Sequence, residues 1–335
     1  MAFYSYMFSA DYKTYFARLK KIAKEEKKFW PFLVLDTGWC VLRYGFALTD
    51  YLVYKAYKKN HKERMEYAGI RRQNDFYELV SPSAHKQRYT VKPIFMQEFK
   101  DYTKRDFVIP GEGNFDAFCA YLDHHEVFMV KPYDGLGGKG IYKCYSKDVA
   151  DRKALFDDCV ANRMFLEDLI IQHPEMNVLC PKSVNTMRII TFNDHGKSEI
   201  LWICLRVGNG HNDVDNFSAE GMAILVDMQT GKLIGKSLNG KNEEFTHHPV
   251  TGVKFEDFQI PCFEEAKELV LKASLESDKI LVVGWDVAIS ENGPVVIEGN
   301  RRPGLGIVQQ VEGRGRMDLV RDVTYRVKTP PQDRT

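Results

Sequence analysis

The segment with the clearest chemical potential is residues 127–145, VFMVKPYDGLGGKGIYKCY, in which Gly135, Gly137 and Gly140 have G-x-G-x-x-G spacing. A dinucleotide-binding fingerprint must open a helix, but β-prone residues follow this loop. A Walker A loop requires Ser or Thr after its lysine, and here Gly140 follows Lys139. The pattern therefore predicts a glycine-rich hairpin tip whose backbone N–H groups can approach phosphate oxygens without interference from a Cβ atom.

Two lysines accompany this loop. Lys131 precedes it on the entering strand, and Lys139 lies in the tip. Each can place a point charge on a phosphate group. A flexible hairpin without a ligand is the alternative, but it does not require a lysine on the strand before it. We therefore favour phosphate binding.

A second set of candidates lies in residues 282–304, VVGWDVAISENGPVVIEGNRRPG. Ser290–Gly293 has the composition of a hairpin turn between two apolar runs. Glu298 and Asn300 are two residues apart and share a face of the predicted strand, and the turn brings Asp286 roughly opposite Glu298. The apolar neighbours include no obvious protein cation that would neutralise these acids. Three oxygen donors on one face therefore predict a Mg²⁺ site shared with substrate phosphates.

A solvent-facing strand with ordinary acidic residues is the alternative to this metal site. Val295, Val296 and Ile297 indicate that the strand is buried. Buried carboxylates need a partner, so we favour the metal site.

The elements that would carry these residues are mixed. The chain has 335 residues, 44% of them hydrophobic and 28% charged, which is ordinary globular composition. Helical patterns occupy residues 114–123, 146–159 and 262–275. Short β-type runs occupy residues 127–130, 140–145, 187–192, 200–207, 222–227, 280–289 and 294–298. Strands in hairpins mixed with helices predict an α+β fold.

Residues 1–80 contain few strand signals and are expected to be helical. The whole chain has a net charge of +1, so bulk charge does not call for a nucleic-acid partner. The first 75 residues nevertheless carry 15 Lys and Arg against 8 Asp and Glu, with Lys20, Lys21, Lys24, Lys27 and Lys28 at helical spacing. A solvated helix face is the favoured interpretation, and contact with a membrane surface stays open.

Within this region, Asp50 to Gly69 is expected to form one long amphipathic helix closed by Gly69. Trp30 to Tyr57 is too polar to span a bilayer, because Asp36, Arg43 and Asp50 interrupt it. Seven cysteines without a C-x-x-C pair are typical of reduced thiols and predict a cytoplasmic protein.

The glycine loop and the carboxylate hairpin together resemble the ATP-grasp superfamily, and most closely its sugar-transfer-associated branch, found among bacterial surface-polysaccharide genes. The resemblance covers approximately residues 60 to 312. It rests on six motifs in order: VKP with the glycine loop from Val130, FLEDLIIQ (165–172), PKSVNTMR (181–188), VDNFSAEG (214–221), GWDVA (284–288) and IEGNRRPG (297–304).

The resemblance implies an α+β ATP-grasp fold in which two subdomains grip ATP. The expected parts are an N-terminal helical region (1–80), a subdomain with the glycine hairpin (81–165), a C-terminal subdomain with the metal hairpin (166–322) and a mobile tail (323–335). ATP-grasp ligases usually carry an N-terminal α/β domain that helps to bind the acceptor, and the helical start of this chain departs from that pattern.

The resemblance also implies roles for individual residues. Lys131 and an earlier lysine, Lys86 with Lys92 as its competitor, would contact the phosphates. Backbone at the hinge would contact adenine, Glu175 would reach the ribose, and Asp286, Glu298 and Asn300 would hold Mg²⁺, with two ions expected. The nucleotide set is Lys86, Lys131, Gly135, Gly137, Gly138, Lys139, Glu167, Asp168, Leu169, Ile170 and Glu175.

Arg188 is expected to face the γ-phosphate or an acyl phosphate, so that Lys131, Arg188 and Arg302 form the catalytic set. Arg302 and Gly304 are expected to hold the carboxylate that is activated; a structural ion pair is the alternative for Arg302. A polar loop with Asp215, Asn216 and Ser218 either binds substrate or supplies turn residues.

The activity implied by the resemblance is an ATP- and Mg²⁺-dependent carboxylate–amine ligase. Its substrates would be a small carboxylate and an amine, with a sugar acid or amino acid of polysaccharide biosynthesis favoured by the genes of that branch. A phosphotransferase acting on a hydroxyl group and a non-catalytic nucleotide-binding scaffold are the alternatives.

Overall fold

The computed structural model describes residues 11–135, 138–211, 221–329 and 331–334. They form two compact units. The first unit combines the described residues up to 83 with residues 241–243 and the described residues from 302 onward. The second contains the described residues of 84–240 and 244–301.

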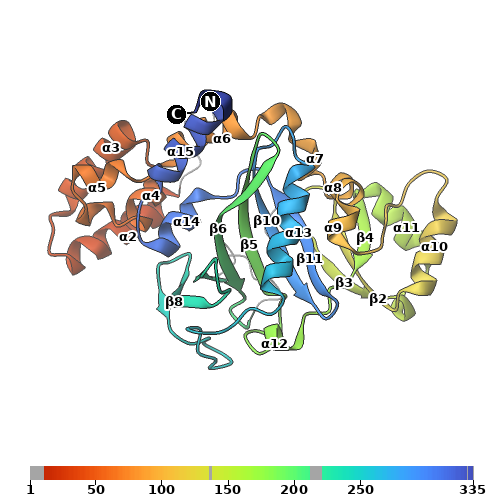
Figure 1. Ribbon diagram of the computed structural model, residues 1–335. Coiled ribbons are helices and arrows are strands. Elements are labelled where there is room, and N and C mark those ends of the chain that lie inside the picture. The colour runs from red at the N-terminus through yellow and green to blue at the C-terminus, as the bar shows by residue number, and fades with distance from the viewer. Residues whose placement is uncertain (1–10, 136–137, 212–220, 330, 335) are drawn as a thin grey trace. The chain divides into compact units, whose positions relative to one another are not determined.

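The first unit is helical (Figure 1). Its core is aromatic and aliphatic, and it includes the fully buried side chains of Leu19, Leu33 and Tyr51. Its α-helices are α2 (Tyr12–Glu25), α3 (Trp30–Tyr44), α4 (Leu48–Val53), α5 (His61–Met65), α6 (Ile70–Val80), α14 (Leu305–Glu312) and α15 (Met317–Lys328). Short 3₁₀ turns occupy Ala56–Lys58 and Pro331–Asp333.

The expected single helix over Asp50–Gly69 is wrong. Lys55 adopts a left-handed conformation, with φ of 51°, just after α4. Asn60 then caps α5 in a reciprocal pair: Glu63 N–H donates to Asn60 Oδ1 (3.1 Å), and Asn60 N–H donates to Glu63 Oε2 (2.7 Å). This capping box starts a new helix inside the amphipathic pattern. Gly69 is the N-cap of α6 and does not end a helix.

The C-terminal residues belong to the same unit as the N-terminal helices. Met317 N–H donates to Glu66 O (2.9 Å), and Tyr67 Oη donates to Gly313 O (2.9 Å). Helix α15 continues to Lys328, within the segment expected as a mobile tail. The units therefore divide the chain differently from the expected boundaries, because contacts between sequence-distant helices leave no local signal.

The second unit contains two antiparallel sheets, so the expected α+β class is confirmed. The smaller sheet has the strand order β1-β4-β2-β3, with β1 (Phe107–Val108), β2 (Val127–Pro132), β3 (Tyr142–Tyr145) and β4 (Met164–Asp168). Apolar side chains of α10 (Phe115–His124) and α11 (Arg152–Ala161) pack on it.

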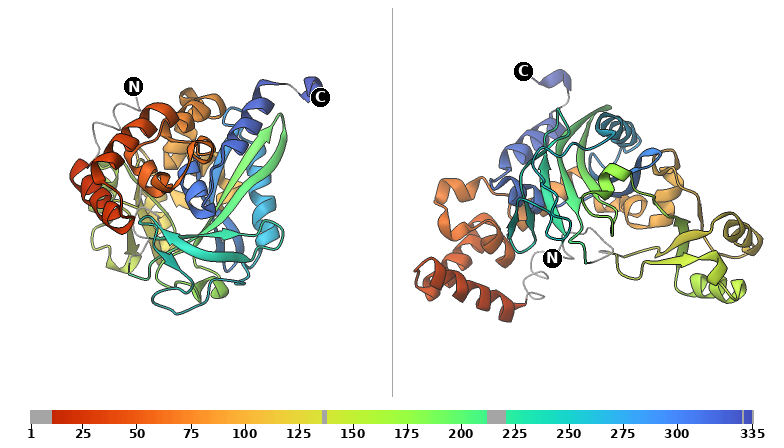
Figure 2. Two further views of the ribbon diagram at one scale, coloured as in Figure 1. Left: turned by 90° about the vertical axis from the view of Figure 1, so that its left-hand side faces the viewer. Right: turned by 90° about the horizontal axis from the view of Figure 1, so that it is seen from below.

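The larger sheet has the order β11-β10-β5-β6-β7-β8-β9. Its strands are β5 (Thr186–Asp194), β6 (Lys197–Val207), β7 (Met222–Val226), β8 (Leu233–Asn239), β9 (Glu244–Phe245), β10 (Val282–Ser290) and β11 (Gly293–Asn300). Helix α13 (Phe263–Leu275) lies along one face (Figures 1 and 2). The remaining helices of this unit are α7 (Gln87–Thr90), α8 (Lys92–Glu98), α9 (Lys100–Thr103) and α12 (Pro174–Asn177).

Strand β10 shows how this sheet separates its two faces. Val283, Trp285 and Val287 belong to the main hydrophobic core, which also receives Ala266 and Val270 of α13. Successive residues of a strand point to opposite faces, so Asp286 lies on the face away from α13. The functional candidates of the hairpin therefore share the face that this core does not use.

Candidate functional site

A row of polar residues crosses the centre of the large sheet. Asp286 of β10 pairs directly with Glu298 of β11 on one side and with Arg188 of β5 on the other. Directly paired residues on antiparallel strands point to the same face, so these three side chains share it. The expected register, with Asp286 opposite Glu298, is confirmed.

Asn300 completes the predicted group of oxygen donors. Its amide Nδ2 lies 3.5 Å from Asp286 Oδ2 and 3.4 Å from Glu298 Oε1. The hairpin thus brings Asp286, Glu298 and Asn300 together. A half-turn of the amide would direct Oδ1 of Asn300 towards a cation held by the carboxylates.

The expectation that no protein cation neutralises these acids is wrong. Asp286 is only 2% exposed, and it accepts hydrogen bonds from both Nε and Nη2 of Arg188, the latter at 3.0 Å. Arg206 of β6 donates through Nη2 to Asp286 Oδ2 at 2.9 Å. The hairpin sequence does not contain these arginines, because they come from strands that become neighbours only in the folded sheet.

The pKa values of the two carboxyls are shifted in opposite directions. Burial disfavours the charged form of Asp286, but Arg188 and Arg206 outweigh it and hold the pKa of Asp286 below its ordinary value of 3.8. Burial, followed by the charge of Asp286, raises the pKa of Glu298 above 4.5. In the described part of the chain, Glu298 makes no ion pair with Lys or Arg.

This donor set fits a hard divalent cation. Glu298 is half-buried and carries a negative charge that a cation would stabilise, and Asn300 adds an oxygen donor beside it. Both oxygens of Asp286 are already bonded to arginines. Glu298 and Asn300 would therefore form the core of the metal site, and Asp286 would join it if an arginine turned away.

Charged side chains of the small sheet form a second cluster. Lys131 of β2 forms an ion pair with Glu167 of β4. Arg105 Nη2 lies 3.7 Å from Glu167 Oε2, and Arg105 Nη1 donates to the carbonyl oxygen of Val296 in β11 at 3.0 Å. Arg105 thus ties the lysine–glutamate pair to the metal hairpin.

Glu167 is buried and stays ionised. Burial opposes its charge, but Lys131 and Arg105 hold the pKa of Glu167 below 4.5. The resemblance implied only backbone contacts at this residue. Its side chain instead neutralises part of the charge of Lys131.

Lys92, rather than Lys86, lies at this cluster. Lys92 Nζ donates to the carbonyl oxygen of Gly135 at 3.0 Å. Burial lowers the pKa of Lys92, while the charge of Glu298 acts to raise it. Lys92 therefore interacts electrostatically with Glu298 of β11. Lys86 is the exposed N-cap of α7. A sequence signal for Lys92 exists, because Val91-Lys92-Pro93 repeats the Val130-Lys131-Pro132 motif.

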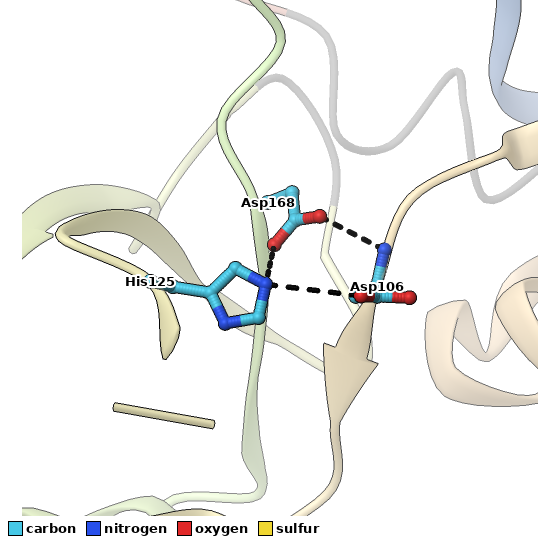
Figure 3. Close-up of side chains that lie close together, drawn as sticks. All are labelled: Asp106, His125 and Asp168. Atoms are coloured by element: carbon cyan, nitrogen blue, oxygen red, sulfur yellow. Dashed lines mark hydrogen bonds and ion pairs between the residues drawn. The ribbon is translucent and has the colours of Figure 1, made fainter. Parts of the chain in front are cut away.

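The expected adenine hinge lies where β4 ends. Leu169 and Ile170 are half-buried and follow the strand without regular structure, and Glu175 is exposed on α12. The carboxylate of Asp168 lies beside His125 and Asp106 (Figure 3). Its Oδ1 accepts from Tyr121 Oη at 2.9 Å, and its Oδ2 accepts from the Asp106 N–H at 3.0 Å.

His125 completes a network around Asp168. Its Nε2 lies 3.1 Å from Asp168 Oδ1 and 3.8 Å from Asp106 Oδ2, and the three potential metal-ligand atoms lie within 4.8 Å of one another. His125 Nδ1 donates to the carbonyl oxygen of Tyr121 at 2.8 Å. These bonds fix the end of β4 to α10, which gives Asp168 an anchoring position that the sequence did not indicate.

The remaining predicted residues are less informative. Gly135, Gly138 and Lys139 lie in the described part of the loop, and Gly137 lies outside it. Asp215, Asn216 and Ser218 also lie outside the described residues. Arg302 and Gly304 belong to the first unit, where Arg302 pairs with Glu78 and contacts Asn74 Oδ1 at 3.3 Å, and Gly304 caps α14.

Comparison with known proteins supplies a family. The family model described as "Sugar-transfer associated ATP-grasp" matches residues 108–324, which is more than half of the chain. No curated protein matches the chain.

Several solved ATP-grasp enzymes resemble the structure. The ligase PsnB, complexed with a precursor variant, Mg and ADP, is 14% identical, with a TM-score of 0.44. The match covers 74% of this chain and 62% of that one, so this chain spans less than two thirds of PsnB. D-alanyl-alanine synthetase A from Vibrio cholerae O1 biovar eltor is 13% identical, with a TM-score of 0.42 and coverage of 74% and 68%.

D-cycloserine synthetase DcsG is 12% identical, with a TM-score of 0.43 and coverage of 76% of this chain and 80% of its own. The family-model match includes the glycine loop, the hinge and the metal hairpin, whose geometry was described above. The chain therefore belongs to the sugar-transfer associated ATP-grasp family.

Proposed function

We propose that this protein is an ATP- and Mg²⁺-dependent carboxylate–amine ligase that forms an amide through an acyl phosphate. The observation that carries the proposal is the pairing of two clusters. The first cluster is cationic and contains Lys92, Lys131 and Arg105. The second supplies oxygen donors from Asp286, Glu298 and Asn300. The pKa of Lys92 is influenced both by Lys131 of the first cluster and by Glu298 of the second.

The charge of the combined site suits a metal–triphosphate complex. Five cationic side chains (Lys92, Lys131, Arg105, Arg188 and Arg206) accompany three carboxylates (Glu167, Asp286 and Glu298). An excess of positive charge around the half-buried pair Glu298 and Asn300 attracts a polyanion that brings its own divalent ion.

Each residue then has a role. Lys92 and Lys131 bind phosphate oxygens, and the glycine loop adds backbone N–H donors. Leu169 and Ile170 lie in the segment that would contact adenine. Glu298, Asn300 and Asp286 would hold Mg²⁺, with two ions expected. When bound, Mg²⁺ neutralises charge that develops on the transferred phosphoryl group.

The chemistry requires no protein nucleophile. A carboxylate oxygen of the substrate attacks the γ-phosphorus, and the bond to the leaving ADP oxygen breaks. An amine nitrogen then attacks the acyl carbon, phosphate leaves, and the amine gives up a proton. We infer that Arg188, which also donates to Asp286, stabilises the negative oxygens in both steps, because a planar guanidinium matches phosphoryl and carboxylate groups.

The substrate class that we propose is a sugar acid or amino acid joined to an amine in surface-polysaccharide biosynthesis. The name of the matched family supports a link to sugar transfer. All seven cysteines are free thiols, which supports a cytoplasmic location. We propose small-molecule partners and no nucleic acid.

The decisive experiment measures ADP release with pairs of uronic acids, amino acids and amines, and traps the intermediate with hydroxylamine. A ligase yields a hydroxamate together with ADP. A kinase, the first alternative, consumes ATP with a hydroxyl acceptor and yields no hydroxamate. A scaffold, the second alternative, releases no ADP with any pair, and that result would refute the ligase assignment.

Substitution of three lysines, with Lys86 as the matched control, tests the phosphate site. We expect Lys92→Ala and Lys131→Ala to lower ADP formation by about 100-fold or more, since each removes a charge from the transferring phosphates. We expect Lys86→Ala to retain nearly full activity. Steady-state ADP assays on variants with unchanged circular dichroism check this, and loss of activity in Lys86→Ala alone would reverse the assignment.

A further inference from the structure

An exposed apolar stripe runs along helix α3 in the first unit. Phe32, Leu35, Trp39 and Leu42 are exposed to 59%, 74%, 56% and 74%. Their spacing places them on one side of the helix, opposite the buried Leu33, Thr37, Cys40 and Tyr44. The helix therefore packs into its unit with one side and presents a continuous apolar stripe on the other.

Large exposed apolar side chains are ordinary when they occur singly, but a contiguous stripe marks an interaction surface. Phe29 and Trp30, at the start of α3, are also exposed, to 74% and 42%. The only charged residues of α3 are Asp36 and Arg43. Asp36 is bonded to Arg64 beneath the helix, at 2.7 and 2.8 Å, so no acid interrupts the stripe.

Lysines of α2 and of the turn that follows it add positive charge beside α3. The two helices lie side by side (Figure 2), and Lys20 Nζ of α2 lies 5.2 Å from the ring centroid of Trp30. Lys20 and Lys24 lie one turn apart on α2, Lys27 follows the end of that helix, and all three are exposed. The nearby acids are compensated, since Glu26 pairs with Lys58 at 2.5 Å and Glu25 lies 3.9 Å from Lys21.

We propose that α3 and the exposed Lys20, Lys24 and Lys27 form a docking surface for an anionic lipid bilayer. Tryptophan, phenylalanine and leucine insert at the boundary between headgroups and acyl chains, and flanking lysines attract anionic headgroups. The protein would lie on the membrane without crossing it. None of the described helices combines the length and apolar character needed to span a bilayer.

A second copy of this chain is a poorer occupant of the stripe. Its own Lys20, Lys24 and Lys27 would approach the same residues of the first copy, and like charges would oppose that contact. An anionic bilayer supplies apolar volume and opposite charge together. The inference uses residues far in sequence from the nucleotide site and does not depend on the proposed ligase activity.

The test uses the full-length chain and vesicles of phosphatidylcholine with about 30 mol % phosphatidylglycerol, compared with pure phosphatidylcholine. We expect co-sedimentation with the anionic vesicles and a blue shift of tryptophan emission. Of the four tryptophans, Trp202 and Trp285 are buried, so Trp30 and Trp39 report the contact. Brominated lipid should quench the same emission.

Two variants separate the apolar and charged contributions. Phe32→Ser/Leu35→Ser/Leu42→Ser should abolish vesicle binding. Lys20→Gln/Lys24→Gln/Lys27→Gln should weaken binding to anionic vesicles by about 100-fold, because each basic residue near such a surface contributes a factor of about five. The matched control, Val160→Ser/Val250→Ser/Leu275→Ser, removes three exposed apolar residues elsewhere and should bind normally.

Sedimentation equilibrium without lipid tests the competing occupant. A stable dimer that the stripe variant dissociates would overturn the proposal. So would a wild-type protein that fails to bind anionic vesicles, or a control variant that loses binding as fully as the stripe variant. Circular dichroism on every variant confirms that each is folded. The ADP assay is run in parallel, so a failure of membrane binding and a failure of the ligase proposal are observed separately.

Discussion

At the scale of residues, the site depends on two carboxyl groups that face each other across β10 and β11 but have different surroundings. Asp286 is held ionised by two arginines, whereas burial and its negative neighbour oppose the charge of Glu298. Asp286 therefore binds the two arginines, whereas a cation would stabilise the charge of Glu298. Substitution by the corresponding amide distinguishes the two roles.

We expect Asp286→Asn to destabilise the protein by about 3–5 kcal/mol, because it leaves Arg188 and Arg206 buried without their shared counter-ion. Urea unfolding measures this free energy. A variant as stable as the wild type would show that the arginines do not depend on Asp286.

We expect Glu298→Gln to stabilise the metal-free protein near neutral pH. The pKa of Glu298 is raised above 4.5 in the folded state, so its favourable contribution is complete below pH 4.5 and is lost as the pH rises through the raised pKa. The gain in Tm should therefore be largest near about pH 7.5 and vanish in acid. Thermal unfolding across this pH range checks the prediction, and a gain that does not change with pH would contradict it.

At the scale of elements, β11 carries Glu298 and Asn300 on one face, and aromatic rings pack closely against its other face. Gly299 lies between them, and a Cβ atom there would lie 2.9 Å from both Tyr89 and Phe95. These rings pack around Trp285 and Phe99, so they cannot withdraw freely. The absence of a Cβ atom at Gly299 allows the rings of Tyr89 and Phe95 to pack directly on β11.

We expect Gly299→Ala to destabilise the fold by about 1–3 kcal/mol through overpacking and to reduce activation by Mg²⁺. The matched control is Gly111→Ala, where a Cβ atom would meet nothing within 4 Å. Urea unfolding and Mg²⁺ titration of ADP formation measure the two effects. If Gly299→Ala matched Gly111→Ala in both, close packing on β11 would not position the site.

At the scale of the whole molecule, the first unit is assembled from both ends of the chain. The fully buried Gln309 of α14 is the hub of this assembly. Its Oε1 accepts from the N–H groups of Ala68 (2.7 Å) and Arg316 (3.2 Å), and its Nε2 donates to Tyr54 Oη (3.0 Å) and Ala68 O (3.1 Å). One side chain thus satisfies groups from three separate segments.

We expect Gln309→Met to destabilise the protein by about 1–3 kcal/mol, since it retains the volume but removes the side-chain acceptor of the buried Ala68 N–H. Gln87→Met on the exposed surface of α7 serves as the control and should be nearly neutral. Urea unfolding compares them. Equal stability of the two variants would show that this hub does not hold the unit together.

The sequence alone determined what depends on local order. The turn at Ser290–Gly293 set the pairing of β10 with β11 as far as Val287 opposite Val296. A β-bulge then pairs Asp286 with Glu298 and turns Glu298 to the face opposite the core residue Val296, so local order placed these acids only roughly. The VKP motif and the glycine loop placed Lys131 on a strand before a hairpin tip.

Only the tertiary structure decided which distant residues become neighbours. Arg206 and Arg188 reach Asp286 because β6, β5 and β10 are neighbours in the sheet. The residue pattern of any one of these strands does not specify that order. The same applies to Lys92 at Gly135 and to Gln309 at Ala68. Pairing of this kind depends on how whole faces pack together, and the residues of one segment do not contain that information.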